Sequence, residues 1–229
     1  QRQMCIRDRQ QYDKLRGKSA VPEAIADVAS PLFGLLGLTT VLVSMVARDF
    51  ALYLSGNTEF TKQVRERVRS KLIELLRRGD KVMLMCHGTG AAVAYDVLWQ
   101  LSHGESYRDE FSASKIDVFV TLGSPISDDM VRRRLLGAKR RSTERYPTNI
   151  ITWQNVSAED DYFCHDKTVA DDLKAMMREH VISSINDYRV YNHAMRYGKS
   201  NPHSSLGYFI HPRVAKIVVD WIGTPHDVI

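Results

Sequence analysis

The segment between residues 82 and 104 restricts the possible folds more than any other part of the sequence. Residues 82–86 form a short, uninterrupted apolar run, and the chain then turns through His87-Gly88-Thr89-Gly90 into an apolar helical pattern that ends near Gly104. A run of this kind is typical of a strand that is buried on both faces of a parallel sheet. A buried strand that turns sharply into a helix predicts an α/β fold.

The same alternation of strand and helix recurs along the chain. Apolar residues at helical spacing, followed by Gly79, predict an amphipathic helix over residues 61–78. Further strands are expected at 116–122, 150–156 and 188–191, with helices at about 166–179 and from Pro212 to Gly223. This order predicts a parallel sheet with helices on both faces, in which sites lie at the carboxyl ends of the strands. The residues expected to be buried in the last helix are Val214, Ile217, Val218 and Trp221.

Chain length and cysteine content restrict the class of protein further. At 229 residues the chain is long enough for one sizeable core, and we expect a poorly patterned lead-in over residues 1–18 before a single domain over residues 19–229. Its three cysteines are widely spaced and odd in number, which favours a reducing compartment over a disulfide framework. The sequence therefore predicts a cytoplasmic protein.

Residues 30–47 lie within the longest uncharged run of the chain. Pro31, Gly34 and Gly37 interrupt the run, and its length is at the lower limit for a bilayer span. No short basic region directly precedes it, as it would in a signal peptide. We predict a buried or lid-like segment, and a peripheral membrane contact is the alternative.

Much of the basic excess behind the net charge of +5 gathers within residues 132–145. The cations of this range are Arg132, Arg133, Arg134, Lys139, Arg140, Arg141 and Arg145. We interpret them as a solvated surface, and an anionic partner such as a phospholipid headgroup is the alternative. Neither interleaved aromatic residues nor a helix-turn-helix pattern accompanies them, so nucleic-acid binding is not expected.

Four segments of the predicted α/β fold carry candidate chemistry. They are Cys-His-Gly-Thr-Gly at 86–90, Leu-Gly-Ser-Pro at 122–125, an acidic loop at 159–161, and Asn-Pro-His-Ser-Ser-Leu-Gly-Tyr at 201–208. In this order the segments resemble those of lipases and esterases of the α/β-hydrolase superfamily. The resemblance covers residues 49–222 and implies an α/β-hydrolase-like fold, ester or acyl hydrolysis, and a small ester or lipid-like ligand.

In that family a serine stands at the sharp turn between strand and helix, which is called the nucleophile elbow. His87 and Gly90 match the His-Ser-x-Gly form of this turn, but Gly88 occupies the nucleophile position and Cys86 replaces the first glycine of the motif. Thr89 follows, and the resemblance implies that its backbone N–H helps to hold an oxyanion.

The resemblance also nominates the other two members of a catalytic triad. Asp161 is the implied acid, with Asp160 as second choice, and His203 is the implied base. A hydroxyl needs such a base within hydrogen-bond reach, and the carboxylate orients the imidazole. Because Gly88 supplies no hydroxyl, we expect a conventional serine mechanism to be impaired.

Several alternatives stay open at the nucleophile position. Thr89 follows it and Cys86 lies two residues before it, but neither lies where the hydroxyl should be. A water activated by His203 would have to replace covalent catalysis. A non-catalytic ligand- or protein-binding module on the same fold is the alternative class of function. Taken singly, His87 is expected to be a packed residue and Ser124 a turn residue that hydrogen bonds to the backbone.

The chain before the elbow is short for this family. Members place several strands there, and one of the connections supplies an oxyanion-hole N–H. The sequence before residue 82 contains no segment similar to His-Gly-Gly. We therefore expect that some N-terminal strands are missing from this chain or that the sheet is small.

Neither a cofactor nor a metal is predicted. The glycines at 88 and 90 are similar to part of a dinucleotide-binding fingerprint, but the third small residue is replaced by Val93 and no acid ends the next predicted strand. No group of histidines and carboxylates has the spacing of metal ligands.

Overall fold

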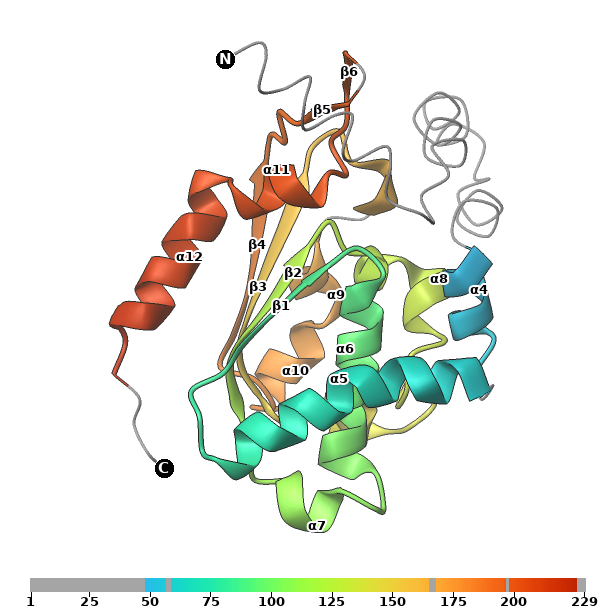
Figure 1. The fold of residues 1–229 in the computed structure, drawn as a ribbon. Helices are drawn as coiled ribbons and strands as arrows, with labels where there is room; N and C mark the ends of the chain where they lie inside the picture. The colour runs from blue at the N-terminus through green and yellow to red at the C-terminus, as the bar shows by residue number, and fades with distance from the viewer. Residues whose placement is uncertain (1–47, 57–58, 165–167, 197, 226–229) are drawn as a thin grey trace. The chain divides into compact units, whose positions relative to one another are not determined.

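Four parallel strands form the sheet of the computed structural model, which describes residues 48–56, 59–164, 168–196 and 198–225 (Figure 1). Their order in the sheet is their order in the chain: β1 (Met83–His87), β2 (Ile116–Leu122), β3 (Ile150–Ala158) and β4 (Ser184–Val190). In this register Thr121 lies between Cys86 of β1 and Asn155 of β3. The predicted parallel α/β architecture is confirmed.

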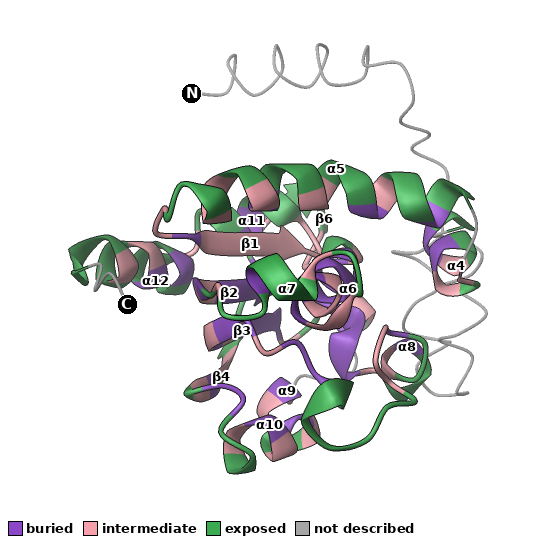
Figure 2. Ribbon diagram, turned by 90° about the horizontal axis from the view of Figure 1, so that it is seen from below, coloured by how far each residue is buried: buried purple, intermediate pink, exposed green. Residues whose placement is uncertain are grey.

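Helices cover both faces of the sheet. On one face lies α6 (Gly90–His103), against which α5 (Glu59–Arg77) packs, and on the other face lies α12 (Pro212–Gly223) (Figure 2). The shorter helical elements are α4 (Arg48–Leu54), α7 (Arg108–Phe111), η2 (Pro125–Ser127), α8 (Asp129–Arg132), η3 (Ser142–Arg145), η4 (Tyr162–Cys164), α9 (Val169–Asp172), α10 (Lys174–Arg178) and α11 (Ser205–Phe209). The strands β5 (Met195–Arg196) and β6 (Lys199–Ser200) form a separate antiparallel pair.

Side chains alternate along β2 and β3, so each strand contributes to the core on both faces. On the α6 face the ring of Trp153 lies 4.8 Å from that of Phe119 and 6.1 Å from that of Tyr95 of α6, between ring centroids. The indole N–H of Trp153 donates to the hydroxyl of Thr121 at 2.9 Å, so the buried nitrogen is satisfied.

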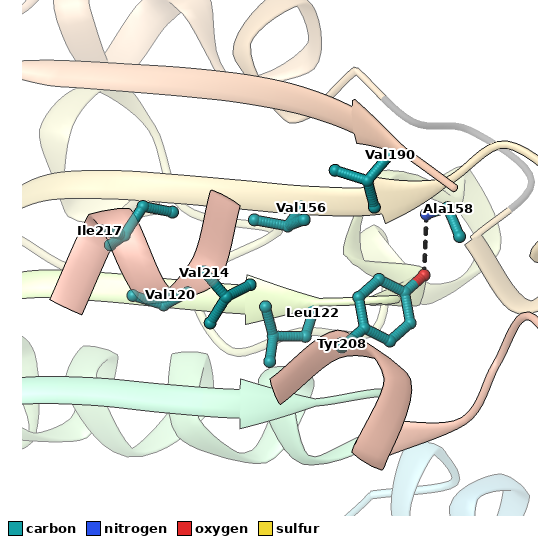
Figure 3. Packing of buried hydrophobic residues seen from close by; sticks show 8 residues of the cluster. All are labelled: Val120, Leu122, Val156, Ala158, Val190, Tyr208, Val214 and Ile217. Carbon is teal, nitrogen blue, oxygen red and sulfur yellow. Dashed lines mark hydrogen bonds between the residues drawn. The ribbon is translucent and has the colours of Figure 1, made fainter. Parts of the chain in front are cut away.

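The core on the α12 face is formed by β2, β3 and β4 together with α11 and α12, the two helices that follow the candidate base His203 in the chain. Its buried members are Val120, Leu122, Val156, Ala158, Val190, Tyr208, Val214 and Ile217 (Figure 3). Tyr208 of α11 is fully buried, and its hydroxyl accepts a hydrogen bond from the N–H of Ala158 at 2.8 Å. This bond holds α11 against the carboxyl end of β3.

The predicted strands are present, with two differences. β4 begins at Ser184 rather than at Tyr188, because its first part is polar and pairs with β3 through backbone bonds that apolar patterning does not mark. β1 was expected to be buried on both faces, but it is the edge strand among the described strands and all its residues are only partly buried. An apolar run alone does not distinguish an edge strand from a central one.

The helix predicted at about 166–179 is two short helices, α9 and α10, which meet at Leu173. The carboxylate of Asp187 in β4 accepts hydrogen bonds from the N–H groups of Val169 and Ala170, at 3.1 and 2.9 Å. A capping residue from a neighbouring strand therefore satisfies the first turn of α9, and no local pattern predicts that.

The predicted burial of α12 is correct at two of its four positions. Val214 and Ile217 are buried, whereas Val218 and Trp221 are only partly buried. The core on this side therefore contacts a narrower stripe of the helix than the four apolar positions suggested.

A buried polar network that the sequence did not indicate joins α4, α5 and α6. The carboxylate of Asp96 accepts bonds from the guanidinium of Arg65 and the hydroxyl of Tyr53, both at 2.6 Å, and from the N–H of Leu136 at 2.7 Å. Burial raises the pKa of Asp96, and the Arg65 charge and these hydrogen bonds oppose the rise. The amphipathic pattern of α5 gave no sign of a buried arginine.

The basic residues of 132–145 lie on the surface. Arg132 pairs with Asp172 at 2.6 Å, and the other six cations of this range are exposed. In the described ranges no helix is both long and apolar enough to cross a bilayer. The predictions for residues 1–18 and 30–47 fall outside the described residues.

Candidate functional site

Gly88 stands at the sharp turn between β1 and α6. Gly88 has φ +55, in the left-handed region that glycine adopts without steric cost, and its N–H donates to the carbonyl of Leu122 at 2.9 Å. A residue with a side chain would adopt this conformation only under strain of about 1–2 kcal/mol. Gly88 therefore forms the sharp turn without that strain.

Asp161, the candidate acid, lies just beyond the end of β3 and is 2% exposed. One carboxylate oxygen accepts from the N–H of Phe163 at 2.9 Å, and the other accepts from the hydroxyl of Tyr208 at 2.7 Å. A buried carboxylate needs such donors to offset its lost hydration. Asp160, the second choice, is exposed.

His203, the candidate base, bonds to Asp161 from the loop before α11. Its Nδ1 lies 2.9 and 3.1 Å from the two carboxylate oxygens of Asp161. A Cβ atom placed on Gly88 would lie 3.3 Å from Nε2 of the same imidazole. The structure therefore brings Gly88, Asp161 and His203 together, in the order acid, imidazole, vacant side-chain position.

The bond to Asp161 determines what His203 offers to a ligand. When the imidazole is neutral, Nδ1 carries the proton and donates it to the carboxylate, so Nε2 is left as an acceptor that faces the space above Gly88. The side chain is 30% exposed, so a ligand can reach it.

Two aromatic rings hold the imidazole of His203 from its sides. The ring of Phe163 stacks on it at 4.4 Å and that of His87 lies at 4.5 Å, between ring centroids. Packing and the Asp161 bond together restrict the rotation of His203, which is what a positioned base needs.

His87 is a packed residue beside the elbow. Burial and the neighbouring charge of His203 lower its pKa to about 4, against the opposing effect of Asp161. Its Nε2 is buried and has no hydrogen-bond partner among the described residues. His87 is therefore neutral at neutral pH and packs on His203 and Tyr208.

The low pKa of His87 predicts how stability depends on pH. Because the unfolded chain binds the proton at about pH 6.5 and the folded chain only at about pH 4, stability should fall as the pH drops through this window, by at most about 1.4 kcal/mol per pH unit from this group. Urea unfolding of His87→Gln from pH 4 to pH 7 should show a flatter profile. An unchanged slope in His87→Gln would contradict the assignment.

The structure does not favour Cys86, two residues before Gly88, as a substitute nucleophile. Burial raises the pKa of the Cys86 thiol to about 12, so the sulfur stays protonated at neutral pH. Thr89 has helical dihedral angles directly before α6, and its side chain makes no capping hydrogen bond. Gly90 begins α6, and a Cβ placed on it would meet no atom within 4 Å.

Ser124 has the structural role that its turn predicted. Its hydroxyl accepts from the N–H of Ile126 at 3.2 Å, and it caps η2 after β2. The preceding residue, Gly123, has φ +53, and a Cβ there would lie 2.7 Å from an Asp161 oxygen and 3.0 Å from the Tyr208 hydroxyl. The turn after β2 therefore has to leave room for the acid of the site.

Gly123→Ala should destabilise the fold by about 2–3 kcal/mol, because a methyl group there adds a steric contact with Asp161 and Tyr208 to the strain of positive φ. Gly79→Ala is the matched control, since Gly79 has φ +68 but a Cβ on it meets nothing within 4 Å. Denaturant titration should give a loss of only about 1 kcal/mol for the control. Equal losses in the two variants would show that the contact with the acid has no cost.

Sequence reasoning missed two residues of this cluster, Tyr208 and Phe163. Tyr208 lies within the segment that nominated His203, but nothing in its pattern distinguishes a buried hydroxyl that binds the acid from a core ring. Phe163 follows Asp161 by two residues, and only the loop conformation shows that its ring stacks on His203. Both contacts depend on tertiary structure.

In the ranges that the structure describes, no group of three or more histidine, cysteine or carboxylate side chains is placed to hold a metal ion. Comparisons with protein-family models, with curated proteins and with solved structures found no match to this chain.

Proposed function

We propose that this chain is an α/β-hydrolase-like protein of the lipase or esterase type, with a site for an ester or acyl ligand in which the serine step is impaired. The observation that carries the proposal is the position of His203. Its Nδ1 bonds to buried Asp161, and its Nε2 lies 3.3 Å from where the first side-chain atom of residue 88 would be.

The arrangement matches what acyl transfer needs apart from the nucleophile. A carboxylate orients the imidazole, the imidazole faces the elbow, and the three positions come in the chain order of this superfamily. The elbow joins a parallel strand to a helix, and the backbone N–H of Thr89, the residue after the nucleophile position, is the group that would face a carbonyl oxygen. An ester or acyl group is the ligand that such a site recognises.

A non-catalytic binding role is the second candidate, and Gly88 itself favours it. Glycine has no group to form an acyl intermediate, and the neighbouring thiol of Cys86 stays protonated. The Asp–His pair then serves as a hydrogen-bonding group for a bound ligand.

Labelling by a serine-directed fluorophosphonate probe tests the proposal. The native chain should not be labelled, Gly88→Ser should be labelled, and Gly88→Ser/His203→Ala should not. A serine at 88 places its Cβ close to Nε2, so the imidazole has to shift by a few tenths of an ångström, and labelling should be slower than in a natural hydrolase. The matched control is Gly90→Ser, which adds the same hydroxyl two residues away, where a Cβ meets no atom within 4 Å.

The outcomes distinguish a hydrolase-type site from a non-catalytic binding site. Labelling of Gly88→Ser alone supports a hydrolase-type site that lacks its nucleophile. Labelling of the native chain would show that Gly88 does not disable the site. If Gly88→Ser is folded but reacts no faster than Gly90→Ser, then His203 and the elbow do not form a hydrolase site and the proposal fails.

A further inference from the structure

Gly88 leaves open space beside the free nitrogen of His203. Outside residues 87–89, the described atoms within 4 Å of a Cβ placed on Gly88 are Nε2 and Cε1 of this imidazole, at 3.3 and 3.5 Å. Gly123, at the neighbouring turn, differs, because a Cβ there would lie within 3.0 Å of both Asp161 and Tyr208. Position 88 therefore has room for a small group, and the imidazole is its neighbour.

The imidazole of His203 is oriented and can be reached from solution. Its Nδ1 bonds to the buried carboxylate of Asp161 at 2.9 Å, and the rings of His87 and Phe163 lie on either side of it. Among the described residues no donor bonds to Nε2, and the side chain is 30% exposed. A neutral imidazole in this state accepts a hydrogen bond from a hydroxyl that enters the space above Gly88.

General-base chemistry does not require that the hydroxyl belong to the chain. The base has to lie within about 2.6–3.2 Å of the oxygen whose proton it removes, and Nε2 can approach a free hydroxyl as closely as an attached one. An unattached hydroxyl lacks the positioning that a covalent link supplies, so its reaction should be slower than that of a serine at 88. The missing side chain therefore removes the attached nucleophile but not the base.

We propose that the chain transfers an acyl group from an ester directly to a small hydroxyl compound from solution, either water or a short primary alcohol. This inference rests on the proposed function and names the acyl acceptor of that site. The acceptor oxygen takes the position that the oxygen of a serine would have, beside Nε2 of His203. No acyl group becomes attached to the chain.

The proposed reaction moves one proton through His203. Nε2 takes the proton of the acceptor O–H while the acceptor oxygen forms a bond to the carbonyl carbon, and an electron pair of the C=O moves to the carbonyl oxygen. When the C=O forms again, the bond to the leaving oxygen breaks and that oxygen takes the proton from Nε2. Water then gives a carboxylic acid, and an alcohol gives a new ester.

The acceptor has to be small. Its oxygen must come within hydrogen-bond reach of Nε2, which lies only 3.3 Å from the Cβ position at Gly88. A branched carbon next to that oxygen would meet the imidazole or the backbone of Gly88, whereas a methyl group is smaller. Methanol should therefore be an acceptor, and tert-butanol should not.

Turnover of phenyl acetate by the full chain tests the proposal, with phenol and both acetyl products measured. The native chain should be at least about tenfold faster than His203→Ala, a smaller gain than the roughly 10²–10⁴-fold of a well-positioned group, because the acceptor is unattached. Added methanol should give methyl acetate in a share that rises with its concentration, in the native chain and not in His203→Ala. The same concentration of tert-butanol should give no ester.

Gly88→Ala tests whether the space itself is used. Its methyl group would lie 3.3 Å from Nε2, where the acceptor has to enter, so turnover should fall to the level of His203→Ala. Gly79→Ala is the matched control, because Gly79 also has positive φ, +68 against +55, and a Cβ on it meets nothing within 4 Å. This control should keep the native turnover. If Gly88→Ala does not fold, the formation of methyl acetate by the native chain and by His203→Ala decides the question.

Three results would overturn the inference. They are native turnover no faster than that of His203→Ala, native turnover in a folded Gly88→Ala, and a burst of phenol that reveals an acyl group attached to the native chain. Labelling of Gly88→Ser by the fluorophosphonate probe tests the proposed function separately, since it depends on an attached hydroxyl. A labelled Gly88→Ser with an inactive native chain would remove this inference and leave the hydrolase-type site in place.

Discussion

Gly88→Ser should raise the turnover number for a short acyl ester by on the order of 10³-fold over the native chain. A general base contributes about 10²–10⁴ to such reactions, and His203 already faces the position that the new hydroxyl would occupy. Adding His203→Ala should remove the gain, and adding Asp161→Asn should remove most of it, because the amide no longer holds the imidazole in the reactive tautomer. Steady-state hydrolysis of an activated ester measures all of these variants.

The gain in turnover number should depend on both the position of the new hydroxyl and His203. Gly90→Ser should stay at the native rate, since a Cβ on Gly90 meets no atom within 4 Å, whereas a Cβ on Gly88 lies 3.3 Å from Nε2 of His203. A gain in Gly88→Ser that survives His203→Ala would mean that the hydroxyl reacts without this imidazole. His203 would then not be the base of the site.

Asp96→Ala should destabilise the fold by about 3–5 kcal/mol. The substitution leaves the guanidinium of Arg65, which is 9% exposed, without its counter-charge, and it removes the acceptor of the Tyr53 hydroxyl and of the Leu136 N–H. Urea unfolding should show a lower midpoint with an unchanged slope.

The control for this prediction is an exposed ion pair. Asp109, whose side chain is 89% exposed, pairs with Arg108 at 3.3 Å, and Asp109→Ala should cost less than about 0.5 kcal/mol. Arg65→Met/Asp96→Leu should recover much of the loss caused by Asp96→Ala, because no buried charge is left unpaired. A double variant as unstable as Asp96→Ala would show that the uncompensated charge of Arg65 is not the main cause of the loss.

Local sequence patterns predicted most of the elements of the fold. Elements with strong apolar periodicity or clear end signals, such as α6, β2 and α12, lie where the sequence placed them. The differences arise where tertiary contacts decide, as in the polar start of β4, the capping of α9 by Asp187, and the edge position of β1. None of these contacts leaves a signal in its own segment.

The candidate site likewise consists of residues that the sequence nominated and of supporting contacts that only the fold shows. The order of motifs along the chain was enough to nominate Gly88, Asp161 and His203, which the fold brings together. The contacts that hold them come from Tyr208, Phe163 and Gly123, and those roles depend on which ring or backbone meets the acid in three dimensions. The buried pair of Arg65 and Asp96 was missed for the same reason, because its members lie on different helices.

The hydroxyl of Tyr208 links the candidate acid to the core, since it donates to Asp161 and accepts from Ala158 while its ring packs under β2 and β3. The link should slow native-state hydrogen exchange at two backbone amides. The amide protons of Ala158 and Phe163 can exchange only when Tyr208 leaves the core or the carboxylate turns away, so both should be protected well beyond the level of surface loops. Their exchange should follow the opening of the sheet around β3, which makes the acid loop part of the same cooperative unit as the central strands.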